Sequence, residues 1–144
     1  MTFHYIEFLT YCHATEKPSK VIEAVENISG EGIELDERES HGHYGNPILI
    51  FTGKLERNRE MKEVFKRFSK DDLEEILTTL EKRVDEQCNF FVRVDKGKAY
   101  EEAIVPSTGN YTIRLRARIE SYPAKREKAL KIAEDYIQEL LRED

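Results

Sequence analysis

The segment from Ile113 to Glu120 alternates between apolar and charged residues almost without interruption. Its apolar positions are Ile113, Leu115, Ala117 and Ile119, and its charged positions are Arg114, Arg116, Arg118 and Glu120. Because successive side chains of a β-strand point to opposite faces of a sheet, this pattern predicts a strand with one face in a core and one strongly basic face. The chain is therefore expected to form a sheet that helices cover on one face only.

Other segments supply the remaining strands and the helices. Alternating or continuous apolar patterns predict strands at residues 2–13, 33–39, 48–55, 90–94, 101–105 and 111–120. Helical spacing of apolar residues predicts helices at residues 16–29, 61–68, 69–84 and 123–141, of which the last has the clearest stripe. Residues 2–13 are apolar in both alternating sets, which is typical of a strand covered on both faces.

The resulting order is β-α-β-β-α-α-β-β-β-α. Short, hairpin-like links between strands favour an antiparallel sheet over a parallel, doubly wound one. We therefore predict an α+β fold of two layers, in which a mostly antiparallel sheet has its helices packed on one face. A chain of 144 residues fits a single domain, residues 1–144, that can bury a core of its own.

The charge of the chain is unevenly distributed. The formal net charge is −6, which argues against a general polyanion binder, yet residues 114–131 hold seven basic and two acidic side chains. Arginines in a row on a sheet can bind successive phosphates, and their guanidinium groups can stack on bases. The alternative is a solvated strand face whose arginines pair with Glu and Asp on neighbouring strands. The candidate RNA-binding residues from this pattern are Arg114, Arg116, Arg118, Lys125, Arg126 and Lys128, with Arg93 on a similar alternating strand.

A loop at residues 41–47 combines two histidines, two glycines and an Asn-Pro turn. Three interpretations stay open: a structural turn, a loop that contacts a ligand, and a metal site built on His41 and His43. Neither these histidines nor the two cysteines have a recognised zinc spacing, so we expect no metal and no cofactor. The sequence also lacks a nucleophile elbow, a phosphate-binding glycine loop and an HExxH helix. We therefore expect no catalytic residues, although an enzyme that uses the two histidines with a carboxylate is kept as an alternative.

The two cysteines and the hydropathy of the chain indicate the cellular compartment of the protein. Cys12 and Cys88 lie far apart in apolar runs, which is typical of a reducing compartment, and no apolar run approaches the roughly 20 residues that span a bilayer. We expect a cytoplasmic protein that does not bind membranes.

Five short motifs resemble those of an archaeal family of small proteins described as RNA-binding and as subunits of the exosome. They are His13-Ala-Thr-Glu16, Gly42-His-Tyr-Gly-Asn-Pro-Ile48, Arg83-Val-Asp-Glu86, Arg93-Val-Asp-Lys96 and Tyr122-Pro-Ala-Lys-Arg-Glu127. The resemblance implies a fold similar to that of the large-subunit ribosomal protein that contacts 5S rRNA, with RNA as the ligand. It adds Lys96 to the RNA-binding candidates and marks His43, Tyr44 and Asn46 as a motif loop. In the family pattern a Gln commonly follows the Asp-Lys pair, where this chain has Gly97.

These observations favour a non-catalytic RNA-binding protein, with exosome components as expected partners in RNA processing. The alternative is a protein-interaction module that joins a ribonucleoprotein complex without direct affinity for RNA. A homodimer stays open, because nothing in the sequence decides the oligomeric state.

Overall fold

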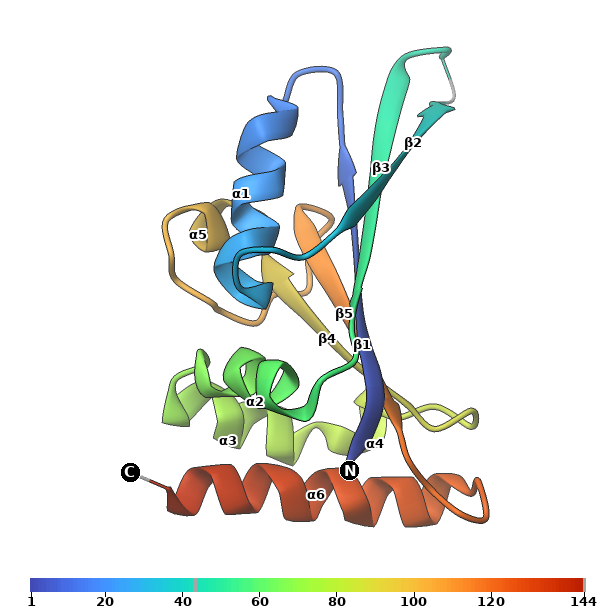
Figure 1. The fold of residues 1–144 in the computed structure, drawn as a ribbon, viewed down its shortest axis with the longest axis vertical. Helices are drawn as coiled ribbons and strands as arrows, with labels where there is room; N and C mark the ends of the chain where they lie inside the picture. The colour runs from blue at the N-terminus through green and yellow to red at the C-terminus, as the bar shows by residue number, and fades with distance from the viewer. Residues whose placement is uncertain (43, 144) are drawn as a thin grey trace.

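A computed structural model describes residues 1–42 and 44–143 and contains a five-stranded antiparallel sheet with helices against one face (Figure 1). The strands are β1 (Phe3–Cys12), β2 (Leu35–His41), β3 (Pro47–Leu55), β4 (Asn89–Asp95) and β5 (Thr112–Ile119). The helices are α1 (Pro18–Ser29), α2 (Asn58–Lys66), α3 (Lys70–Thr78), α4 (Leu80–Arg83), α5 (Lys96–Tyr100) and α6 (Arg126–Arg142). The order across the sheet is β2-β3-β1-β5-β4, so β1 is central and β2 and β4 form the edges. The predicted fold class is confirmed.

One face of each central strand forms the core. In β5, Ile113, Leu115, Ala117 and Ile119 are buried, whereas the three arginines between them are partly exposed. In β1, Ile6 and Phe8 are buried, but Tyr5, Glu7 and Leu9 on the other side are only partly buried. The expectation that residues 2–13 are covered on both faces is therefore wrong. The apolar residues on the second face of β1 lie among charged side chains of the neighbouring strands, without a second helical layer.

Aromatic packing joins the sheet to the helices. The ring of Phe3 lies 5.5 Å from that of Phe65 in α2 and 4.9 Å from that of Tyr136 in α6, and Phe65 stacks on Phe90 of β4 at 5.9 Å. Aromatic pairs at such separations contribute roughly 0.5–1.5 kcal/mol beyond their buried area. Burial raises the pKa of the Tyr136 hydroxyl well above its ordinary value. The two helices are thus held against the same end of the sheet.

The chain between β4 and β5 differs from the expected strand at residues 101–105. Asp95 caps a short helix, α5, by accepting a hydrogen bond from the backbone N–H of Lys98 at 2.8 Å. The following residues form turns, and the link to the sheet is an isolated bridge between Val94 and Pro106. A side-chain cap directly after β4 therefore begins a helix where the sequence pattern suggested a turn and another strand.

The hairpin of β2 and β3 extends past the rest of the sheet, away from α6 (Figure 1). Its outer strand has exposed side chains at nearly every position. No helix of the described residues is long and apolar enough to cross a membrane.

Candidate nucleic-acid interface

The sheet face opposite the helices combines arginines with aromatic rings. Strand pairing places Arg114 between Leu9 of β1 and Arg93 of β4, and the next outward residue, Arg116, between Glu7 and Phe91. Arg118 then lies between Tyr5 and Asn89, and Lys54 of β3 pairs with Glu7. Paired residues of an antiparallel sheet share a face. We call the set Tyr5, Glu7, Lys54, Phe91, Arg93, Arg114, Arg116 and Arg118 the open face.

A single carboxylate holds two of these arginines. Nη2 of Arg114 lies 3.2 Å from Oε1 of Glu7, and Nη2 of Arg116 lies 3.2 Å from Oε2 of the same residue. All three side chains are about a quarter exposed, with values of 25–28%. The interpretation that the arginines pair with neighbouring carboxylates therefore applies to these two. Arg93 and Arg118 make no ion pair with any residue that the structure describes.

Aromatic rings lie beside the same guanidinium groups. Cζ of Arg114 lies 5.7 Å from the ring centre of Phe91, and Cζ of Arg116 lies 5.6 Å from that of Tyr5. The ammonium of Lys54 approaches Tyr5 to 4.3 Å. The Nε atoms of Arg114 and Arg116 are buried and have no hydrogen-bond partner in the described part of the chain. The open face thus places partly exposed guanidinium groups next to rings on which bases can stack.

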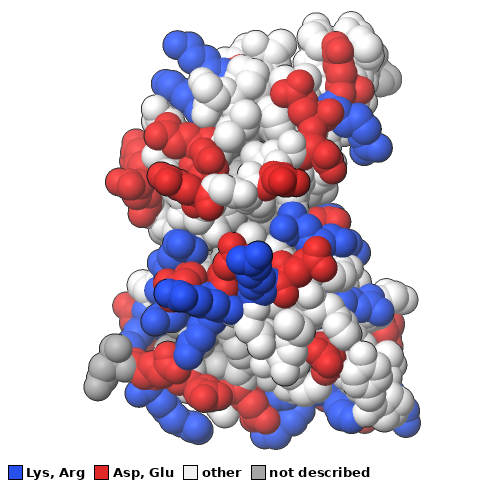
Figure 2. Space-filling view, viewed as in Figure 1, with Lys and Arg blue, Asp and Glu red and all other residues white. Residues whose placement is uncertain are grey.

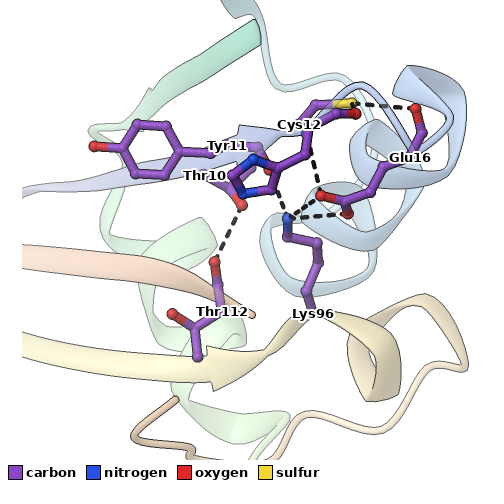
Figure 3. A network of polar contacts seen from close by, with 7 residues as sticks. Thr10, Tyr11, Cys12, Glu16, Lys96 and Thr112 are labelled. Atoms are coloured by element: carbon purple, nitrogen blue, oxygen red, sulfur yellow. Dashed lines mark hydrogen bonds and ion pairs between the residues drawn. The ribbon is translucent and has the colours of Figure 1, made fainter. Parts of the chain in front are cut away.

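Lys96 lies inside the protein, away from the open face (Figure 3). Its ammonium donates hydrogen bonds to the backbone carbonyl of Tyr11 at 2.5 Å and to both carboxylate oxygens of Glu16 at 3.1 and 3.2 Å. The lysine side chain is 4% exposed, and the ring of Tyr111 lies 4.7 Å from its Nζ. We therefore do not include Lys96 in the interface, because its charge is already neutralised within a buried network that joins α5 to the end of β1.

The basic residues at the start of α6 divide into two kinds. Arg126 donates from Nε to the carbonyl of Val84 at 3.0 Å and from Nη2 to that of Glu81 at 2.6 Å, so it links α6 to α4 and its surroundings. Lys128 donates to the carbonyl of Tyr122. Lys125 is exposed at the N-cap position, and its side chain does not cap the helix. All three belong to the helical layer and not to the open face.

The motif loop closes the hairpin of β2 and β3. The N–H of Gly42 donates to the carbonyl of Asn46 at 2.7 Å, and Gly45 has a φ of 81°, a conformation that favours glycine. Tyr44 is 89% exposed, and Asn46 is also exposed. His43 lies outside the residues that the structure describes. Among the described residues no group of three His, Cys, Asp or Glu side chains is arranged to hold a metal ion.

The sequence analysis missed Tyr5, Glu7, Lys54 and Phe91 as members of the site. Glu7 interrupts an otherwise apolar strand, which is a signal that one face of that strand is polar. Its two arginine partners are 107 and 109 residues away in sequence, so local pattern alone does not identify the pairing.

The helical layer has a different charge distribution. In the view of Figure 2, acidic side chains gather beside α1 and α5, and basic side chains over α2 lie among acidic ones. On the open face, four arginines of β4 and β5 lie beside the single carboxylate of Glu7, whereas Lys54 shares a hollow with Glu7, Glu34, Asp36 and Glu56.

Comparison with known proteins gives consistent results. The model of a family described as RNA binding matches residues 5–119, a range that includes every residue of the open face. The chain is 32% identical to RNA-binding protein PAB1135 of Pyrococcus abyssi over 144 residues, 94% of each chain. It is 38% identical to protein MJ0213 of Methanocaldococcus jannaschii over 106 residues, 66% of this chain and 70% of that one. The structure of a DUF54 protein from Methanothermobacter thermautotrophicus covers 99% of this chain and 100% of its own, with 33% identity and a TM-score of 0.83.

Proposed function

Because the chain belongs to the family that the RNA-binding model describes, we propose that it is a non-catalytic RNA-binding protein and that RNA lies across the open face. The observation that carries the proposal is the row of four arginines on β4 and β5, Arg93, Arg114, Arg116 and Arg118, beside the single carboxylate of Glu7. Phosphate oxygens are strong acceptors for guanidinium groups, because a bidentate pair supplies two charge-assisted hydrogen bonds. Tyr5 and Phe91 provide the apolar surface for bases.

Single-stranded RNA suits this surface better than duplex. Bases that are unpaired can stack on the partly exposed rings of Tyr5 and Phe91, whereas a duplex offers mainly its phosphates and 2′-hydroxyls. About five phosphate contacts would give a slope of log affinity against log salt of about −3.5 on single strands and about −4.5 on duplex. The net charge of −6 weakens long-range attraction, so binding is expected to be modest and sensitive to salt.

The test is a titration of a short single-stranded RNA at several salt concentrations with wild type and with the variant Arg93→Gln/Arg118→Gln. These two arginines have no carboxylate partner among the described residues, so their removal leaves no buried charge unpaired. The variant should bind more weakly, and its salt slope should be shallower by about 1.4. The variant Lys66→Gln/Lys131→Gln removes the same charge from exposed positions of α2 and α6 and serves as the control. Equal losses in both variants would show a general charge effect and would contradict the proposal.

We also propose that the protein acts in the cytoplasm as an accessory of the exosome in RNA processing, which rests on the motif resemblance. Copurification of exosome subunits with the native protein, kept after nuclease treatment, would support a direct contact. If wild type does not bind RNA but does retain exosome subunits, the chain is an interaction module and the RNA-binding proposal fails.

A further inference from the structure

The outer edge of β4 is covered at both ends but open in the middle. At one end Val84 bridges Phe90, and the N–H of Asp85 donates to the carbonyl of Asn89 at 3.0 Å. At the other end Val94 bridges Pro106, and the N–H of Ser107 donates to the carbonyl of Arg93 at 2.8 Å. A cavity of about 250 Å³ lies between the two covering segments. We call it the edge notch.

The lining of the edge notch is basic and contains no carboxylate. It is formed by Lys82, Arg83, Phe91, Arg93, Ser107 and Thr108, so three basic residues and two hydroxyl residues line one space. None of the three cations forms an ion pair with any of the residues that the structure describes. This lining differs from that of the Lys96 network, in which a carboxylate neutralises the cation.

Arg83 is held in position at the notch. Its Nε donates to Oγ1 of Thr79 at 2.8 Å, and its Nη1 approaches the carbonyl of Phe91 at 3.4 Å. Burial lowers the pKa of its guanidinium group, and the carboxylate of Glu75 only partly opposes this effect. An anion in the notch would oppose it further, and the fixed guanidinium would lose little conformational freedom on binding the anion.

We propose that the edge notch binds a backbone phosphate of an RNA strand whose bases lie on the open face. The inference rests on the proposed function and adds a defined contact to it. Phe91 and Arg93 line the notch and also belong to the open face, so one strand of RNA can reach both. The volume is several times the roughly 30 Å³ that a water molecule occupies in the liquid, which leaves room for a phosphate with part of its ribose.

Lys82→Glu is the most informative variant, because Lys82 is exposed and lies outside the open face. Lys66→Glu is its matched control: both lysines are exposed and lie in the last turn of a helix. Single-stranded RNA is titrated at several salt concentrations with wild type and both variants. Lys82→Glu should weaken binding about tenfold and make the salt slope shallower by about 0.7, the loss of one phosphate contact, whereas Lys66→Glu should change affinity less than threefold.

A second arm uses inorganic phosphate and follows the backbone amide signals of Ser107 and Thr108 by NMR in wild type and Arg83→Gln. Shifts in wild type that disappear in a folded Arg83→Gln support a phosphate site in the notch. If RNA binds with the same affinity to Lys82→Glu and to wild type, the edge notch is not a phosphate site, and the proposed RNA-binding function stands. If RNA does not bind and phosphate still shifts these signals, the edge notch binds small phosphate compounds. The proposal that it binds a backbone phosphate of RNA is then wrong. If neither ligand binds, both proposals fail.

Discussion

The ion pair of Lys96 with Glu16 and the arginine cluster around Glu7 differ in burial and in charge balance. At the end of β1, Lys96 and Glu16 form a one-to-one pair with side chains 4% and 14% exposed, completed by the carbonyl of Tyr11. On the open face, Glu7 receives both Arg114 and Arg116 at a quarter exposure. In the described part of the chain, their Nε atoms have no hydrogen-bond partner, and Arg93 and Arg118 form no ion pair. A balanced, buried pair makes the fold sensitive to the loss of either partner, because the remaining charge is then buried alone. An unbalanced, accessible cluster instead leaves positive charge to attract a ligand.

Lys96→Met tests the structural side of this comparison and should have the largest effect. It leaves the carboxylate of Glu16 and the carbonyl of Tyr11 without their buried donor, so the free energy of unfolding should fall by about 3 kcal/mol. Lys98→Met, on the exposed side of the same helix, should change it by less than about 0.5 kcal/mol. Urea denaturation followed by circular dichroism measures both. A variant that keeps wild-type stability but loses affinity for RNA would show that Lys96 belongs to the interface after all.

Tyr5→Leu tests the stacking role of the open face. The guanidinium of Arg116 and the ammonium of Lys54 lie beside the ring of Tyr5. Leucine at this position keeps an apolar side chain but has no aromatic ring for stacking. Loss of one stacked base costs about 1–3 kcal/mol, so affinity for single-stranded RNA should fall about tenfold with little change on duplex. Tyr44→Leu removes an exposed ring at the motif loop and is the comparison. Fluorescence anisotropy with labelled RNA gives both values, and equal loss on duplex and single strands would argue against stacking.

Arg126→Met separates the helical layer from the interface. Its guanidinium donates to the carbonyls of Val84 and Glu81, so its removal should lower the free energy of unfolding by about 1 kcal/mol. The neighbouring exposed Lys125, changed to Met, should leave stability within about 0.5 kcal/mol. Thermal unfolding of the two variants side by side measures the difference. A stable Arg126→Met with tenfold weaker RNA binding would move the interface to the start of α6.

Glu7→Gln should have the smallest effect, and it should raise the affinity for RNA while it lowers the free energy of unfolding. Without the carboxylate, Arg114 and Arg116 can turn toward phosphates, so affinity for RNA should rise a few-fold and the salt slope should steepen. Stability should fall by about 0.5–1 kcal/mol, because partly exposed ion pairs contribute little. Glu74→Gln, at an exposed position of α3, controls for net charge. If Glu7→Gln binds RNA more weakly than Glu74→Gln does, the two arginines serve the fold and not the ligand.

The alternation of β5 was predictable from sequence because the two-residue period of a strand fixes which residues share a face. It also predicted which side of the sheet lacks helices. The role of Lys96 was not predictable, because Glu16 lies 80 residues earlier and only the completed sheet brings α1 and α5 together. The helix at Lys96–Tyr100 depends on the Asp95 cap, a single side-chain contact that the apolar pattern of the following residues concealed.

The edge notch was also not predictable from local sequence patterns. Lys82 and Arg83 end a helix, Arg93 lies in a strand, and Ser107 and Thr108 belong to the loop before β5. The sequence of each segment alone is typical of exposed surface and does not indicate a binding site. Their common lining arises only because two separate stretches of chain cover the edge of β4 and leave its middle open.

The most direct test of the account is an NMR titration of the native protein with a short single-stranded RNA, followed through backbone amide signals. The account predicts the largest shifts at Tyr5, Phe91, Arg93, Arg116 and Arg118 on β1, β4 and β5, and unchanged signals around Lys125 and Arg126 at the start of α6. Shifts confined to the start of α6, with β1, β4 and β5 unaffected, would contradict it.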